Sequence, residues 1–188
     1  MDGTEPERTL RLARSDDTSA IDALMKASIR DIFPQFYDER QTASSVIHVA
    51  VPDEMLIEDG TYFVIDEPGG DIVACGGWSR RDKLYTGSGA GADDARPLDP
   101  LTEPARVRAM FVRGDRARRG LGTRILEACE RAAREEGFTT LALLATLPGV
   151  QLYQRFGFRP TGDYTDVRLP DGVLLSCLPM EKPVSPSR

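Results

Sequence analysis

The sequence contains one histidine, His48, and only three cysteines, Cys75, Cys129 and Cys177. A disulfide framework needs an even set of cysteines at close spacing, and a zinc site needs several clustered ligands. The three cysteines are far apart and lie in apolar segments, so we predict buried thiols. A Ser-His-Asp triad or a zinc centre would depend on His48 alone, and the motif context of both is missing. We therefore predict no metal site.

Long hydrophobic runs are also missing. No stretch approaches the roughly 20 apolar residues that a membrane span requires. The opening MDGTEPERTL is too polar for a secretory signal. We expect a cytoplasmic protein with no membrane partner. With 40% hydrophobic residues, the chain suffices for one full core. We place one domain over residues 1–182 and a disordered tail over 183–188.

The chain is acidic, with a net charge of −6, yet it contains one strongly basic segment. Between Arg106 and Arg124, seven arginines stand against a single acid, Asp115. A nucleic-acid binder usually spreads its basic residues over a wide face to neutralise many phosphates. The concentrated charge favours a small polyanion instead, and no nucleic-acid partner is predicted.

Hydrophobic periodicity and turn residues predict alternating element types. A long loop without periodicity, rich in Gly, Asp and Pro, is expected between Arg80 and Ala105. Strand, helix and buried strand from Arg106 to Ala145 form a right-handed crossover unit. In its first strand the alternation places Val107, Ala109 and Phe111 on one face. Strands are expected over residues 8–14, 106–112 and 139–145, and hairpins over residues 61–79 and 158–181. Helices are expected after Asp17, over residues 38–49, from Leu121 to Gly137 and over residues 147–157.

The entrance to the helix at Leu121 has the features of an anion site. The first backbone N–H groups of a helix lack partners within it and carry the positive end of its dipole. Gly120 and Gly122 would leave these groups open, and Arg118 and Arg119 add charge beside them. The segment lacks the Gly-Lys-Ser/Thr of a Walker loop and the third glycine of a dinucleotide fingerprint. A turn glycine beside a solvated arginine face is the alternative explanation.

The segments MFVRGDRARRGLGTRILEACE and GFTTLALLATLPGVQLYQRFGFRP resemble the GNAT superfamily of acyl-CoA-dependent N-acetyltransferases. The resemblance is close over Arg106 to Pro160 and looser over Arg8 to Met180. It implies a single α/β (α+β) domain whose mixed, mostly antiparallel sheet is flanked by helices. It also implies that the parallel fourth and fifth strands splay apart, with the pantetheine arm of acetyl-CoA in the gap.

The resemblance also implies roles for individual residues. Tyr153, in Leu-Tyr-x-x-x-Gly-Phe, falls on the tyrosine that often protonates the departing thiolate. Ala117 departs from the family pattern, which has Gln or Arg there, so any side-chain contact made at that position is absent. The cofactor-binding positions are Arg118, Arg119, Gly120, Leu121, Gly122 and Thr123 on the pyrophosphate loop, and Met110, Phe111 and Val112 where backbone groups hold the pantetheine arm and the acetyl carbonyl.

Transfer from a thioester to an amine needs an unprotonated nucleophile, support for the oxyanion and a proton for the sulfur. A tyrosine, with an ordinary pKa of about 10, is protonated at pH 7 and can supply that proton. Glu103, His48, Asp31 and Asp163 are each candidates for the general base, and none is assigned. The acceptor site is expected near Ile32 to Tyr37, Trp78 and the Arg80 to Ala105 loop.

The favoured function is acetyl transfer to a primary amine of a small molecule or peptide. The alternative is a GNAT-like module that binds acyl-CoA for regulation without turnover. The acceptor amine and the oligomeric state, a homodimer included, stay open.

Overall fold

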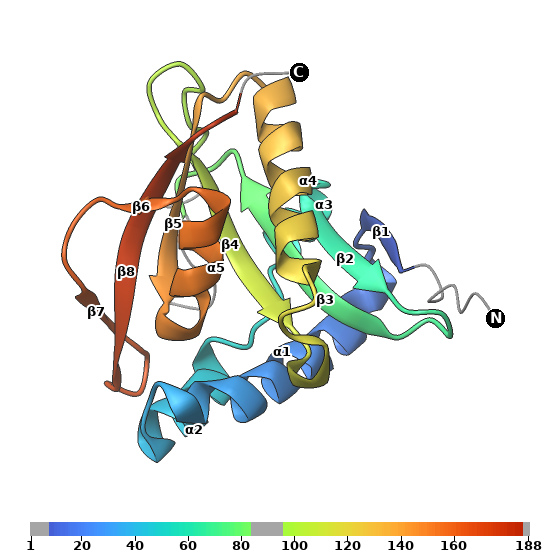
Figure 1. Ribbon diagram of the computed structural model, residues 1–188, viewed down its shortest axis with the longest axis vertical. Helices are drawn as coiled ribbons and strands as arrows, with labels where there is room; N and C mark the ends of the chain where they lie inside the picture. Colours follow the sequence, from blue (N-terminus) through green and yellow to red (C-terminus); the bar gives the residue numbers. More distant parts are fainter. Residues whose placement is uncertain (1–7, 84–95, 186–188) are drawn as a thin grey trace.

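The computed structural model describes residues 8–83 and 96–185. Its chain order follows the expected alternation of strands and helices (Figure 1). The strands are β1 Thr9–Leu12, β2 Tyr62–Asp66, β3 Ile72–Ser79, β4 Ala105–Val112, β5 Thr140–Thr146, β6 Arg159–Pro160, β7 Thr165–Arg168 and β8 Leu174–Pro183. The helices are α1 Thr18–Ile32, α2 Glu39–His48, α3 Glu54–Glu58, α4 Leu121–Glu135 and α5 Val150–Phe156.

All eight strands form one sheet, in the order β1-β2-β3-β4-β5-β8-β6, with β7 paired to β8. β4 and β5 are parallel, and the other neighbours are antiparallel. The predicted mixed α/β fold is therefore confirmed. α3 was not predicted, because a helix of one turn has too few residues to show a helical period.

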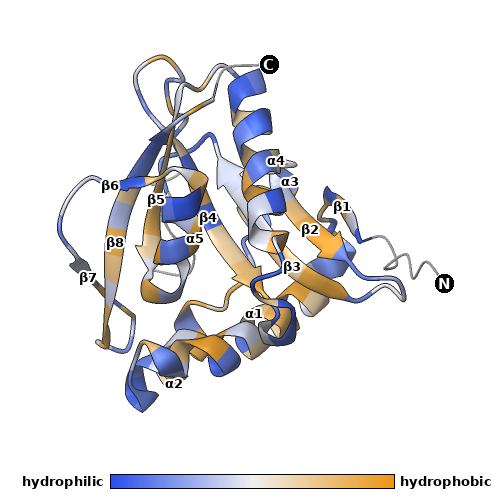
Figure 2. Ribbon diagram, in the orientation of Figure 1, coloured by the Kyte–Doolittle hydropathy of each residue, from blue (hydrophilic) through white to orange (hydrophobic). Residues whose placement is uncertain are grey.

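Helices cover both faces of the sheet and enclose two apolar clusters. α4 and α5 pack on one face around Ile125, Leu141 and Phe158, all fully buried. α1 and α3 pack on the other around Ile21 and Leu56. Figure 2 shows the outward side of α4 as largely hydrophilic and the strands beneath it as largely hydrophobic. Each face of the central sheet is therefore shielded from water, which explains the apolar character of β5 on both sides.

Strand β4 corrects the predicted alternation. Its register against β3 passes from Cys75↔Phe111 to Gly77↔Arg108, so β4 has one residue more than β3 over this stretch. This β-bulge reverses the facing of the residues after it. Val107 therefore shares a cluster with Met110 and Val112, while Ala109 and Phe111 pack in the other cluster.

The C-terminal residues correct the predicted start of the tail. Pro183 belongs to β8, and the backbone N of Ser185 donates to Glu130 on α4 at 2.7 Å. The buried Lys182 ammonium also pairs with Glu130, so this end of the chain is anchored to α4. Residues 186–188 lie outside the described residues.

The three cysteines are buried and free, as predicted. Burial raises the pKa of the Cys75 and Cys177 thiols to about 12. Over residues 8–83 and 96–185, no helix combines the length and the apolar content that crossing a membrane requires.

Candidate functional site

A gap opens where the two parallel strands diverge. β4 and β5 pair only at Ala105↔Leu141 and Arg106↔Ala142, near the start of each strand. Beyond these pairs a cavity of about 1020 Å³ occupies the gap. It runs from the residues before α4, along β4 and past α5, to the region where α1, α2 and the β7–β8 hairpin meet. The splayed strands implied by the family resemblance are present.

The predicted anion site lies at one end of this cavity. Gly120 is the N-cap of α4 and has a φ of +78°, and Arg118 has a φ of +63°. Such left-handed backbone is rare for a non-glycine residue and is often associated with functional sites. No side chain caps the helix, so its first N–H groups have no side-chain partner among the described residues. Arg118, Gly120, Leu121, Gly122 and Thr123 line the cavity, whereas Arg119 does not.

Gly122 was predicted to keep the N–H groups of α4 open, but the structure gives it a role in helix packing. A Cβ at this position would lie 2.7 Å from a terminal carbon of Leu152 on α5. Gly122 therefore permits the close packing of α4 on α5. A Cβ at Gly120 would meet nothing within 4 Å, so only Gly120 leaves open space at the helix entrance.

Most of the basic segment is neutralised by neighbouring acids. Arg106 pairs with Asp82, and buried Arg108 pairs with Asp53 at 2.7 Å. Arg113 and Arg116 both pair with Glu67 at the end of the β2–β3 hairpin. Among the described residues, Arg118, Arg119 and Arg124 form no ion pair, and Arg124 donates to the carbonyl oxygen of Arg8. The uncompensated positive charge is therefore located at the N-terminus of α4, where the helix dipole has the same sign.

The exposed edge of β4 faces the gap. The backbone N of Arg113 donates to the carbonyl of Val73 on β3 at 2.9 Å. Because backbone groups alternate between the two edges of a strand, those of Met110 and Val112 face the other edge, which β5 has left. Met110, Phe111 and Val112 all line the cavity. Unpaired backbone donors are thus available along the cavity wall.

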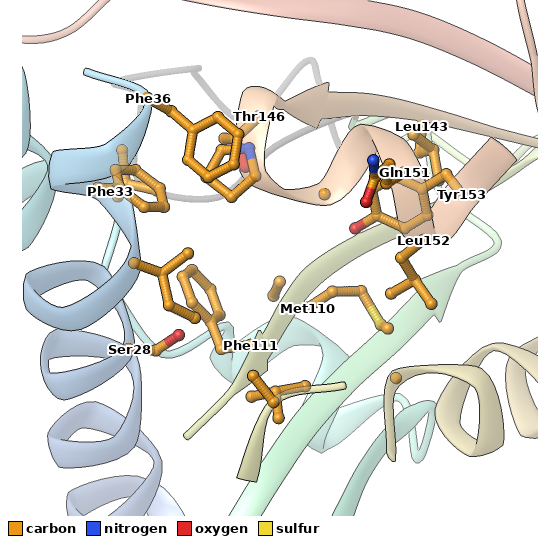
Figure 3. A pocket seen from close by; sticks show the side chains of 18 of the residues that line it. Ser28, Phe33, Phe36, Met110, Phe111, Leu143, Thr146, Gln151, Leu152 and Tyr153 are labelled. Atoms are coloured by element: carbon orange, nitrogen blue, oxygen red, sulfur yellow. The ribbon is translucent and has the colours of Figure 1, made fainter. Parts of the chain in front are cut away.

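Tyr153 lies across the cavity from this edge. Its side chain is 9% exposed, and Figure 3 shows its hydroxyl turned into the space bordered by Met110 and Leu152. No hydrogen bond of the hydroxyl is found among the described residues. Burial raises the pKa of Tyr153, and Cys129 contributes a smaller effect in the same direction. A Cβ at Gly149 would lie 2.7 Å from the ring, so Gly149 provides the room for it.

Two of the four candidate bases reach the cavity. Asp31 and His48 line it, and His48 lies 3.7 Å from Asp171. Glu103 does not line the cavity. Its carboxylate is bound by Arg96, which lowers the pKa of Glu103 to about 2. Asp163 is exposed on the β6–β7 connection, away from the cavity lining.

The predicted acceptor region is only partly found at the cavity. Ile32, Phe33 and Phe36 line it, and Figure 3 places both phenylalanines on the side opposite Tyr153. Trp78 was a wrong prediction: it is 1% exposed and packs edge-on against Phe138 in the core. None of the described residues of the Arg80 to Ala105 loop lines the cavity. Residues 84–95 of that loop lie outside the described residues.

Sequence reasoning missed the contribution of the β7–β8 hairpin. Val167, Leu169, Leu175 and Cys177 line the far end of the cavity. Their sequence signal is the alternation of an ordinary strand, which does not distinguish a cavity wall from a core.

Comparison with solved structures supports the fold over nearly the whole chain. A GCN5-related N-acetyltransferase from Rhodopseudomonas palustris has a TM-score of 0.70 and 19% identity, and the match covers 97% of this chain and 98% of that one. The PaiA N-acetyltransferase of Thermoplasma acidophilum, in complex with coenzyme A, has a TM-score of 0.65 and 13% identity, with coverage of 94% and 99%. YncA of Salmonella typhimurium, with its cofactor acetyl-CoA, has a TM-score of 0.61 and 16% identity, with coverage of 97% and 96%.

No curated protein sequence matches the chain. A family model does: the model of the acetyltransferase (GNAT) domain matches residues 58–160, which is more than half of the sequence. The matched residues include β4, the helix entrance, β5 and Tyr153. This chain therefore belongs to the GNAT acetyltransferases, and acetyl-CoA is its cosubstrate.

Proposed function

We propose that the protein transfers the acetyl group of acetyl-CoA to a primary amine of a small molecule or peptide, by direct attack of the amine on the thioester. The observation that carries this proposal is that one continuous cavity joins all parts of the site. This cavity joins the open entrance of α4, the free edge of β4 and the Tyr153 hydroxyl to the space where α1, α2 and the β7–β8 hairpin meet. We call this space the far chamber. A module that only bound acyl-CoA would need no such chamber.

The cosubstrate would enter with its pyrophosphate at the Arg118 to Thr123 loop. The N–H groups of α4 and the charge of Arg118 favour an anion there. From this end the pantetheine arm would follow the β4 edge, where the N–H groups of Met110 and Val112 are available. The thioester would then lie between β4 and Tyr153.

In the reaction, the nitrogen lone pair forms a bond to the acetyl carbon, and the carbonyl oxygen becomes negative. A β4 N–H group stabilises this oxyanion. The carbon–sulfur bond then breaks, and the Tyr153 hydroxyl gives its proton to the departing sulfur. The amine nitrogen loses one proton, and the tyrosinate regains one from solvent. Asp31 and His48 are the candidates for accepting the amine proton.

The far chamber supports an acceptor whose amine is carried on an apolar group. Phe33, Phe36, Leu169 and Leu175 contribute apolar side chains to its walls. Phe36 is 46% exposed and lines this end of the cavity, where a bound ligand would cover it. Elsewhere in the cavity lining, Asp31 lies against Gly114, between β4 and α4, and its carboxylate forms no ion pair among the described residues.

An assay of thiol release from acetyl-CoA tests the proposal. We expect turnover with amines that carry an aromatic or branched apolar group, and much weaker turnover with polyamines and aminoglycosides of equal amine content. Replacing Phe36 with serine should raise the KM of an apolar amine by about tenfold, since a large apolar contact area is lost. Thiol release with none of the amines, amino acids or peptides, despite binding of acetyl-CoA, would favour the non-catalytic module.

Arg118 and Arg119, which lie side by side before α4, should differ in their importance for acetyl-CoA. Arg118 lines the cavity and Arg119 does not. We expect Arg118→Ala to weaken acetyl-CoA binding severalfold, and Arg119→Ala to have a smaller effect that disappears as salt increases, because a distant exposed charge is screened. Calorimetry at low and high ionic strength measures both. Equal losses at every salt concentration would contradict this distinction.

A further inference from the structure

Tyr62 is a buried residue at the start of β2 that reaches the bulge of β4. It is fully buried, and its hydroxyl donates a hydrogen bond to the carbonyl oxygen of Ala109 at 2.9 Å. The thiol of Cys75 on β3 lies 3.9 Å from the same oxygen. A Cβ at Gly77 would lie 2.7 Å from the Tyr62 ring, so the glycine on β3 provides the space in which the ring reaches Ala109.

Ala109 has an unfavourable backbone conformation. Its φ is +57°, in the left-handed region that residues other than glycine seldom adopt. Such a conformation persists only where its surroundings stabilise it, and it is frequent at functional sites. Here two side chains donate to the Ala109 carbonyl oxygen, the Tyr62 hydroxyl at 2.9 Å and, as a weaker donor, the Cys75 thiol at 3.9 Å.

The Ala109 carbonyl and the Met110 N–H belong to the same peptide unit. In a trans peptide these two groups point in opposite directions. Tyr62 holds the carbonyl on the side of the α1 and α3 cluster, to which it belongs. The N–H of Met110 is therefore directed away from that cluster, and Met110 itself lines the cavity opposite Tyr153.

We infer that Tyr62 is a positioning residue for acetyl transfer. By fixing the Ala109–Met110 peptide unit, it aims the Met110 N–H at the carbonyl oxygen of the bound thioester. This inference rests on the proposed position of the acetyl group along β4. Tyr62 touches neither substrate, so its effect should appear in the polarisation of the thioester and in kcat, and not in the binding of coenzyme A.

The test compares Tyr62→Phe with Tyr37→Phe. Tyr37 is a matched control, because it is also a buried tyrosine whose hydroxyl bonds the backbone, donating to Ser176 at 2.7 Å and accepting from Leu147 at 2.9 Å. Acetyl-CoA labelled with ¹³C at the carbonyl is bound without acceptor, and its carbonyl band is recorded by infrared difference spectroscopy. Coenzyme A affinity and kcat are measured on the same samples.

In the wild type and in Tyr37→Phe, we expect the carbonyl band to move to lower frequency than in free acetyl-CoA. In Tyr62→Phe the carbonyl band should return most of the way to its frequency in free acetyl-CoA. The kcat should fall about tenfold, because a misdirected oxyanion donor loses most of its effect. Coenzyme A affinity should stay unchanged. A wild-type band in Tyr62→Phe would overturn the role of Tyr62. Absence of a shift in the wild type would instead contradict the proposed position of the acetyl group.

If Tyr62→Phe does not fold, the same spectrum is recorded in the double variant Tyr62→Phe/Ala109→Gly. Glycine adopts the left-handed conformation without steric cost, so the bulge forms even when the hydroxyl is absent. Loss of the band shift in this variant supports the inference. A retained shift would overturn it, because the bulge alone would then suffice to direct the N–H group.

Discussion

Replacing Tyr153 with phenylalanine lowers kcat for acetyl transfer by about 10²-fold or more and leaves the dissociation constant of acetyl-CoA nearly unchanged. This is the expected result if the hydroxyl protonates the departing thiolate. The ring stays in place in the variant, because its packing is edge-on against Phe158, with ring centroids 5.8 Å apart. The hydroxyl has no hydrogen-bond partner among the described residues, so its removal should cost little stability.

The raised pKa of Tyr153 determines the pH range of this effect. Burial favours the neutral phenol, so the proton leaves only above the ordinary tyrosine value of about 10. Between pH 7 and 9 the donor is therefore present, and no fall in kcat over that range should come from its ionisation. A pre-steady-state measurement is required, because slow product release could hide a slower chemical step.

Two further variants separate proton donation from packing. Gly149→Ala keeps the hydroxyl but forces the Tyr153 ring to move, since the new Cβ would lie 2.7 Å from it. We expect it to lower kcat as well. Tyr164→Phe removes the hydroxyl of an exposed tyrosine that does not line the cavity and should leave kcat nearly unchanged. Full activity of Tyr153→Phe in the chemical step would mean that water or another residue protonates the sulfur.

Replacing Gly120 with valine should weaken acetyl-CoA binding by tenfold or more, which corresponds to about 1.4 kcal/mol or more. Gly120 has a φ of +78°, and a β-branched residue in the left-handed region is strained by about 1–2 kcal/mol. The valine side chain would also occupy the open space at the helix entrance, where the N–H groups of α4 meet the pyrophosphate. Isothermal titration calorimetry measures the loss.

Gly60→Val is the matched control for this variant. Gly60 has a φ of +69°, and a Cβ there would also meet nothing within 4 Å, but Gly60 does not line the cavity. The two variants should lose similar stability in thermal unfolding, whereas only Gly120→Val should lose affinity. Unchanged affinity of a folded Gly120→Val would exclude this loop as the pyrophosphate site.

The sequence by itself determined the helices and strands whose hydrophobic residues repeat with a clear period. It also determined the site residues that lie in one continuous segment. α4 was predicted because Leu121, Ile125 and Cys129 repeat at helical spacing, and all three are buried. The helix entrance, β4 and Tyr153 all lie between Ala105 and Tyr153 and carry the family's spacing. Local backbone chemistry, such as the glycine at the N-cap of α4, is encoded in neighbouring residues and can be predicted from them.

Only the tertiary structure decided which charges remain uncompensated and where the bulge of β4 lies. The arginines of the basic segment appear equivalent in sequence, but Asp53, Asp82 and Glu67 neutralise four of them from distant elements. The bulge depends on the register between β3 and β4, which alternation within one strand does not specify. The β7–β8 wall of the chamber and the bond from Tyr62 to Ala109 likewise join residues far apart in the chain. Such contacts form only when the folded chain packs. The hydrophobic effect that drives packing is non-directional, so the residues next to each partner in the sequence do not indicate which contact will form.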